Sequence, residues 1–267
     1  MFPVKSIFKI LCLLIFLGLI INCKKKEVIS KDCQELKDAG IVDDYDFKKN
    51  TSWANHDSYT DKLRACQIPG NVLREMCTIG LIETCLNYPY WVDVFAFDNV
   101  QYGYNLLFRD NFNGIQELYN RADAGIELLE IYKKMDPGGY SDTWSSIERG
   151  QLGWSIIYIE LILTQDELIL SLNEEQRICL LKESLKKYES KLDHIETHGI
   201  FGLTGSAYVL AHLMINMNFT PFIDAINDDQ ELQYFIETLD YHIYSDFINE
   251  LNKIVFYANQ LINLNTK

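Results

Sequence analysis

The chain has 267 residues, enough for one sizeable domain or two small ones, and its 38 acidic and 24 basic residues give a formal net charge of −14. An acidic protein of this kind is repelled by nucleic acid and by anionic membrane surfaces, so we exclude nucleic acid as a partner. The sign of the charge names no other partner, because acidic residues also keep exported proteins soluble.

Residues 1–22 have the layout of a secretory signal peptide. Lys5 and Lys9 give a basic start without any acid, and an uncharged apolar stretch follows at residues 10–21. A membrane-spanning helix is the alternative. Twelve residues at about 1.5 Å each cover roughly 18 Å, well short of a hydrocarbon core of about 30 Å, so the signal peptide is favoured.

Residues 20–23, Ile-Ile-Asn-Cys, resemble a lipobox, the site where bacteria diacylate a cysteine and cleave the chain just before it. Asn22 stands where Gly, Ala or Ser is usual, and this relaxed form resembles the lipoboxes of Bacteroidota. We therefore predict that Cys23 is lipidated and that its acyl chains hold the protein on a lipid bilayer. The expected location is the cell envelope, with the outer membrane favoured and its periplasmic or surface face left open. An ordinary secreted protein with a free cysteine is the alternative.

Seven cysteines occur, but Cys12 would leave with the signal peptide and Cys23 would carry lipid. The remaining five leave at least one thiol unpaired; they are Cys33, Cys66, Cys77, Cys85 and Cys179. No CxxC pair and no histidine at zinc-ligand spacing accompanies them, so we predict no zinc site. Export permits disulfides, but we favour buried thiols that pack as small hydrophobes.

The mature chain divides into a polar tether, residues 23–57, and an all-α domain, residues 58–267. Prolines are few, and apolar residues repeat in steps of three and four. We expect one multi-helix array or irregular α-solenoid-like domain, with a division into two lobes near residues 136–141, where Asp-Pro-Gly-Gly marks a turn. The expected helices span 59–66, 70–86, 99–109, 115–134, 142–164, 173–192, 203–217 and 231–262.

Two motif runs lie in the first half of this domain. Residues 65–89 contain ACQIP, VL and TCLNYP, and residues 113–125 contain NGIQEL and RADAG. Together they resemble an uncharacterised family of secreted or lipid-anchored Bacteroidota proteins, over about 75 residues from Leu63 to Pro137. The resemblance implies an exported, helical protein and implies no activity. The same residues are also typical of the starts and ends of helices, since Pro69 fits a first helical turn.

Eight aromatic residues lie between Tyr88 and Phe108, with carboxylates and an arginine among or beside them. Such side chains can line a sugar- or peptide-binding cleft, but aromatic rings also dominate ordinary cores, and we favour core packing. The candidate ligand-binding residues are Tyr90, Trp91, Asp93, Asp98, Tyr102, Tyr104 and Arg109.

The helix expected at 142–164 is apolar nearly all round from Trp154 to Leu163, except for Glu160, and is therefore central. A buried glutamate tends to have a raised pKa and suits general-acid catalysis, so an envelope hydrolase with a carboxylate-based site is an alternative function. An ion pair on Glu160, with no other carboxylate converging on it, would remove the main support for this alternative.

His194 and His198 are four residues apart and share one helix face, as metal-binding pairs do. In the zinc-binding motif HExxH the glutamate directly follows the first histidine, whereas Glu196 lies midway between the two histidines here. Gly199 directly follows His198, which indicates a helix end. We therefore predict neither a metal nor a cofactor. The glycines from Gly199 to Gly205 follow no strand, so we expect a close helix crossing there instead of a phosphate-binding loop.

The sequence contains no set of side chains at a spacing typical of a catalytic site. We therefore name no catalytic residue and favour a function without catalysis. We predict a cell-envelope lipoprotein that acts as a helical binding or interaction module for a protein, peptide or glycan. A purely structural envelope component is a further alternative.

Overall fold

The computed structural model describes residues 31–50, 55–240 and 247–265. Within these ranges the regular elements are helices and no strand occurs, which confirms the expected all-α class. The predicted signal peptide, 1–22, and the predicted lipidation site, Cys23, lie outside the described residues.

The chain forms two compact units, which meet in sequence between Ile41 and Val42. In the first unit the structure describes one helix, α2 (Lys31–Asp38). The second unit starts well before residue 58, the predicted start of the domain, because Tyr45 and Phe47 are buried in its core. The chain is not divided near residues 136–141.

The first part of the second unit consists of short helices. These are α3 (Phe47–Asn50), α4 (Tyr59–Ala65), α5 (Gly70–Glu75), α6 (Thr78–Leu86), α7 (Trp91–Val94), α8 (Val100–Tyr104), the π-helix η2 (Asn105–Arg109) and α9 (Asn113–Asn120). The helix expected at 70–86 is interrupted because Met76 and Cys77 are extended, with ψ of 135° and 155°. Extended Arg121 interrupts the helix expected at 115–134 in the same way.

The second part contains the longer helices. They are α10 (Ala124–Lys134), α11 (Ser146–Leu163), α12 (Asp166–Ser171), α13 (Glu174–Asp193), α14 (Ile195–Asn216), α15 (Thr220–Asn227), α16 (Gln230–Thr238) and α17 (Phe247–Leu264). Asn173 is the N-cap of α13 and exchanges hydrogen bonds with Gln176 in a capping box, as the spacing of three residues between Asn and Gln predicts. Helix α11 begins with a similar box at Ser145 and Glu148, a few residues after the expected start at residue 142.

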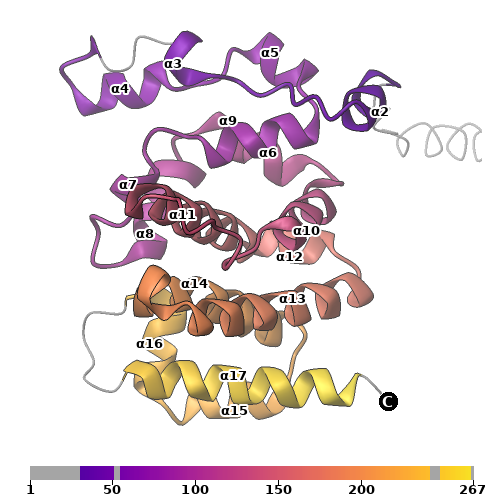
Figure 1. Cartoon of the computed structure of the whole chain (residues 1–267), viewed down its shortest axis with the longest axis vertical. Coiled ribbons are helices and arrows are strands. Elements are labelled where there is room, and N and C mark those ends of the chain that lie inside the picture. The colour runs from indigo at the N-terminus through magenta and orange to yellow at the C-terminus, as the bar shows by residue number, and fades with distance from the viewer. Residues whose placement is uncertain (1–30, 51–54, 241–246, 266–267) are drawn as a thin grey trace, which may run out of the picture. The chain divides into compact units, whose positions relative to one another are not determined.

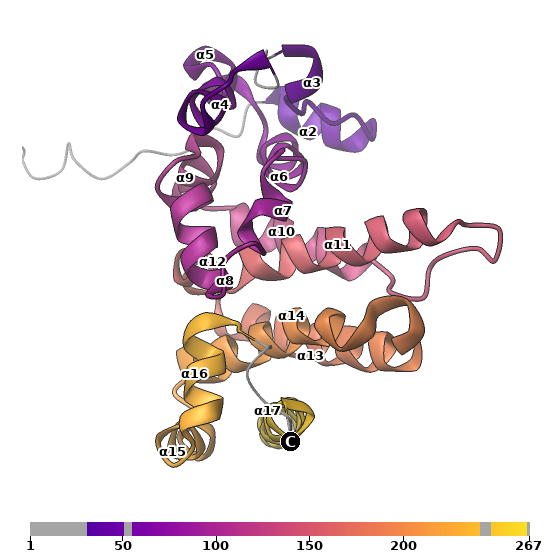
Figure 2. The ribbon, with the colours of Figure 1, turned by 90° about the vertical axis from the view of Figure 1, so that its left-hand side faces the viewer.

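Helix α14 lies at the centre of this part, in contact with α11, α13 and α17 (Figures 1 and 2). Among the described residues it is the one helix long and apolar enough to cross a bilayer by length and composition, and most of that stretch is buried by its neighbours. Gly199 bends it near its start, at a positive φ of 63° that side chains disfavour.

The cysteines differ in state. Cys66 and Cys85 are buried free thiols, as expected, and burial raises the pKa of the Cys66 thiol to about 12. Cys33 and Cys77 are each disulfide-bonded, which differs from the expectation of packed thiols.

Candidate functional site

Three of the seven candidate ligand-binding residues are core residues. Trp91, Tyr104 and Tyr90 are all buried, with 2%, 0% and 5% of their surface exposed. The Trp91 indole N–H donates to the Cys85 carbonyl at 2.8 Å, and the Tyr104 hydroxyl shares a 2.7 Å hydrogen bond with the Tyr119 hydroxyl. These polar atoms are satisfied inside the protein, which is the usual way that buried Trp and Tyr pack.

The other four candidates are half-buried or exposed. Asp98 and Tyr102 are exposed, and Asp93 accepts a 2.9 Å hydrogen bond from the Tyr59 hydroxyl. Arg109 forms a two-pronged ion pair with Glu167, at 2.5 and 3.1 Å, which holds the pKa of that carboxyl below its usual value. The buried rings of this segment pack on one another in the core, in stacked and edge-to-face pairs, which is the arrangement favoured from the sequence.

Glu160 lies at the centre of a buried polar network. Lys191 donates to both of its carboxylate oxygens, at 2.8 and 2.7 Å. The Tyr132 hydroxyl at 2.7 Å and the Ser206 hydroxyl at 2.6 Å donate to the same carboxylate. Lys191 also donates to the Gly202 carbonyl at 2.8 Å. The network thus joins α10, α11, α13 and α14 around one negative and one positive charge.

This network is closed to solvent, because the Glu160 and Lys191 side chains are both 0% exposed. A Cβ atom on Gly205 would lie 2.2 Å from a Glu160 oxygen, so the absence of a side chain there allows α11 and α14 to approach. Burial lowers the pKa of Lys191, while Glu160 opposes that shift. No second carboxylate hydrogen bonds to Glu160 among the described residues, which removes the main support for a hydrolase.

His194 and His198 both bind backbone carbonyls. Nδ1 of His194 lies 2.9 Å from the Ser190 oxygen, and Nε2 of His198 lies 2.9 Å from the Pro137 oxygen. Burial lowers the pKa of His198, so this ring is neutral at pH 7. The described residues contain no group of three or more metal-ligating side chains. His198 therefore links the turn after α10 to the start of α14, whereas the hydrogen bond of His194 lies within the end of α13.

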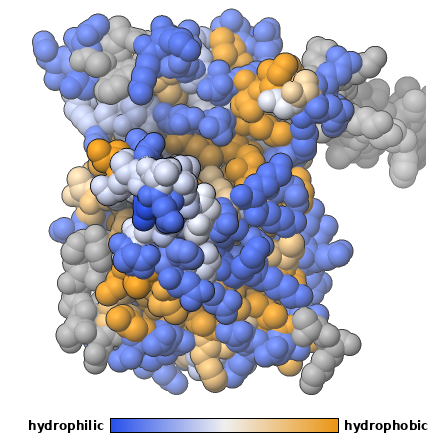
Figure 3. Space-filling model, in the orientation of Figure 1, coloured by the Kyte–Doolittle hydropathy of each residue, from blue (hydrophilic) through white to orange (hydrophobic). Residues whose placement is uncertain are grey.

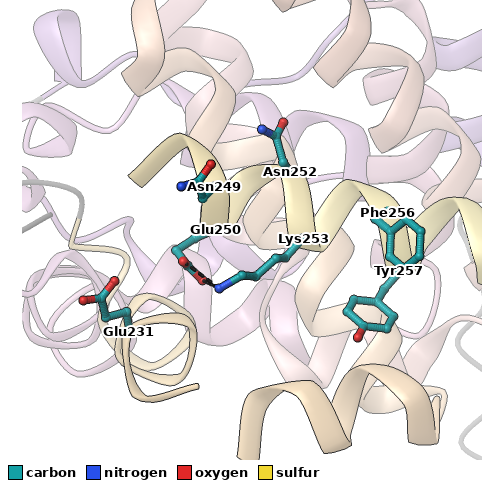
Figure 4. Close-up of a pocket in the computed structure, with 7 residues that line it drawn as sticks. All are labelled: Glu231, Asn249, Glu250, Asn252, Lys253, Phe256 and Tyr257. Atoms are coloured by element: carbon teal, nitrogen blue, oxygen red, sulfur yellow. Dashed lines mark hydrogen bonds and ion pairs between the residues drawn. The ribbon is translucent and has the colours of Figure 1, made fainter. Parts of the chain in front are cut away.

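A shallow open pocket of about 660 Å³ lies on α17, and we call it the C-terminal groove. Figure 4 shows its seven lining residues: Glu231, Asn249, Glu250, Asn252, Lys253, Phe256 and Tyr257. Glu231 comes from α16 and the other six from α17. Around α17, hydrophilic and hydrophobic side chains are intermingled on the visible surface (Figure 3). The groove is therefore amphipathic and not an apolar slot.

Lys253 holds two carboxylates at one wall of the groove. Its ammonium donates to both oxygens of Glu250, at 3.0 and 3.2 Å, and it forms an ion pair with Asp229, the N-cap of α16. Burial raises the pKa of Glu250, and the hydrogen bond from Lys253 opposes that shift. Lys253 therefore links the start of α16 to α17 and has two carboxylate partners of its own.

The rim of the groove consists of Asn249, Asn252 and Phe256, which follow one another by three and four residues on one face of α17 (Figure 4). Phe256 is 57% exposed. Neither amide side chain hydrogen bonds to another residue that the structure describes. Within the described part of the chain, the rim thus offers two amides without a hydrogen-bond partner beside an exposed ring.

Sequence reasoning missed this groove. The segment 231–262 was expected as helical, but the pairing of Asp229 with Lys253 joins two helices across 24 residues and has no local signature. The spacing of Asn249, Asn252 and Phe256 was the one available signal. Comparison with protein-family models, curated proteins and solved structures finds no match to this chain.

Proposed function

We propose that this protein is a lipid-anchored binding module of the cell envelope and that it holds a polar ligand in the C-terminal groove. The observation that carries the proposal is the groove itself. Its rim places the amides of Asn249 and Asn252, which hydrogen bond to no other side chain in the described ranges, beside the exposed ring of Phe256. Binding sites commonly combine apolar surface with a few polar groups that orient the ligand.

The anchor in this proposal is Cys23, within the Ile-Ile-Asn-Cys sequence that follows the apolar stretch. Two or three acyl chains suffice for stable membrane attachment, because each buried CH₂ contributes about 0.8 kcal/mol. The polar residues after Cys23 then separate the folded unit from the bilayer. Binding without catalysis is favoured over hydrolysis because Glu160 is sealed in its ion pair with Lys191.

The anchor is tested by mass spectrometry of the N-terminus after expression of the full chain in a bacterium that acylates lipoproteins. We expect the mature protein to start at Cys23 with a diacylglycerol adduct. Cys23→Ala should abolish the adduct and release the protein from the membrane fraction. An unmodified terminus elsewhere in the wild-type protein would contradict the anchor.

The groove is tested by hydrogen–deuterium exchange of the full, detergent-solubilised protein with two probe sets, neutral hexasaccharides and neutral hexapeptides. We expect one set to slow exchange in residues 247–264. Exchange that stays unchanged there with both sets, or slows only elsewhere, would overturn the groove as the binding site and favour a purely structural envelope component.

A further inference from the structure

Resting on the proposed function, we propose that the ligand of the C-terminal groove is a neutral oligosaccharide. The groove measures about 660 Å³, within the range of about 300–1,000 Å³ that small-ligand sites occupy. Its exposed ring, Phe256, presents an apolar face with negative π character, on which the C–H groups of a sugar ring pack.

The amides supply the polar half of this recognition. A primary amide donates two hydrogen bonds and accepts two, and a sugar hydroxyl also both donates and accepts. The side chains of Asn249 and Asn252 neither donate a hydrogen bond to a described residue nor accept one from it. Both lie on the same helix face as Phe256 (Figure 4). A ring on the Phe256 face therefore places its hydroxyls within reach of paired donors and acceptors.

The charges of the groove disfavour an anionic ligand. Its cation, Lys253, is engaged by Glu250 and Asp229. Glu231 forms no ion pair within the described part of the chain, so the charge left for a ligand is negative. The chain as a whole carries −14, which adds to the repulsion of phosphorylated or uronic-acid ligands.

A peptide fits this site less well. Extended peptides bind by adding a strand to a sheet edge, and the described residues contain no strand. Helical peptides bind with an apolar face in an apolar groove, whereas five of the seven residues that line this groove have amide or charged side chains. The chemistry of the groove thus favours hydroxyl-rich ligands over peptide ligands.

The test uses the full, detergent-solubilised protein and isothermal titration calorimetry with maltohexaose, cellohexaose, chitohexaose, a hexagalacturonate and a neutral Gly-Ser hexapeptide. We expect at least one neutral hexasaccharide to bind and hexagalacturonate to bind more weakly. Phe256→Ala should weaken binding about tenfold, because it removes the ring face. Asn252→Ala should weaken binding about threefold to tenfold, the effect of one lost hydrogen bond.

Matched control variants lie on the same helix. Ile248 is 52% exposed and does not line the groove, so Ile248→Ala controls for the loss of exposed apolar surface. Asn259 donates to the Val255 carbonyl outside the groove, so Asn259→Ala controls for the loss of an amide. Both should bind within about twofold of the wild-type protein, a free-energy change below about 0.5 kcal/mol.

The outcomes separate this inference from the function on which it rests. Binding of the hexapeptide alone, weakened by Phe256→Ala, would overturn the sugar ligand and retain the binding module. Sugar binding that both Phe256→Ala and Asn252→Ala leave intact would overturn this site. No binding of any of the five probes would overturn the inference, and unchanged exchange in residues 247–264 would overturn the module as well.

Discussion

Two glutamate–lysine pairs in this protein differ in how much solvent reaches them. Glu160 and Lys191 are completely buried, and the carboxylate accepts hydrogen bonds from three side chains. Glu250 is nearly buried, but its partner Lys253 is 44% exposed and lies at an open groove. The comparison teaches that the sealed pair serves the fold, because no ligand reaches it, whereas the open pair shapes a surface that a ligand can touch.

The strongest test of this difference between the two pairs is Lys191→Met. It leaves the Glu160 charge buried without its cation, so we expect the free energy of unfolding to fall by about 3–5 kcal/mol. Urea unfolding at pH 7 measures the change. Adding Glu160→Gln removes the uncompensated charge and should restore part of the loss. A Lys191→Met protein as stable as the wild-type protein would show that the pair contributes nothing.

A second variant tests the close approach at the sealed pair. Gly205→Ala places a methyl group 2.2 Å from a Glu160 oxygen in the undisturbed structure. We expect a loss of about 1–3 kcal/mol from overpacking, measured by thermal and urea unfolding. Gly150→Ala is the control, since a Cβ at this α11 position meets nothing within 4 Å and should stabilise the helix. Equal effects of the two variants would contradict this explanation.

The open pair should matter less. Lys253→Met removes a half-exposed cation from Glu250 and Asp229, so we expect a loss of about 1 kcal/mol or less. Urea unfolding beside Lys191→Met gives the direct contrast. A loss for Lys253→Met as large as that for Lys191→Met would remove the distinction between the two pairs.

The smallest expected effect is a pH dependence from Glu250. Its folded-state pKa is raised above the ordinary value of 4.5 by burial, against the opposing Lys253. The folded state therefore holds the proton more tightly, and this contribution is present below pH 4.5 and is lost as the pH rises through the raised pKa. Relative to Glu250→Gln, the wild-type protein should lose stability above pH 4.5. The opposite slope in urea unfolding would contradict the raised pKa.

Local patterns in the sequence predicted the all-α class, the long helices and the central position of Glu160. Capping at Asn173 was predictable because its partner, Gln176, is three residues away. The short helices around Met76 and Arg121 were not, because extended residues with no proline or glycine interrupt them. The partner of Glu160 was unknown, since Lys191 lies 31 residues further along the chain.

The central position of α14 has a consequence for finding ligands. Helix α17 packs against α14, and α14 also contacts α11 and α13, which hold the sealed pair. A compound that binds only the folded form of α17 raises the free energy of unfolding by RT ln(1 + [L]/Kd). At a hundred times its Kd this amounts to about 2.7 kcal/mol. An increase in the melting temperature of the full chain that Phe256→Ala diminishes is therefore a practical screen for compounds that occupy the C-terminal groove.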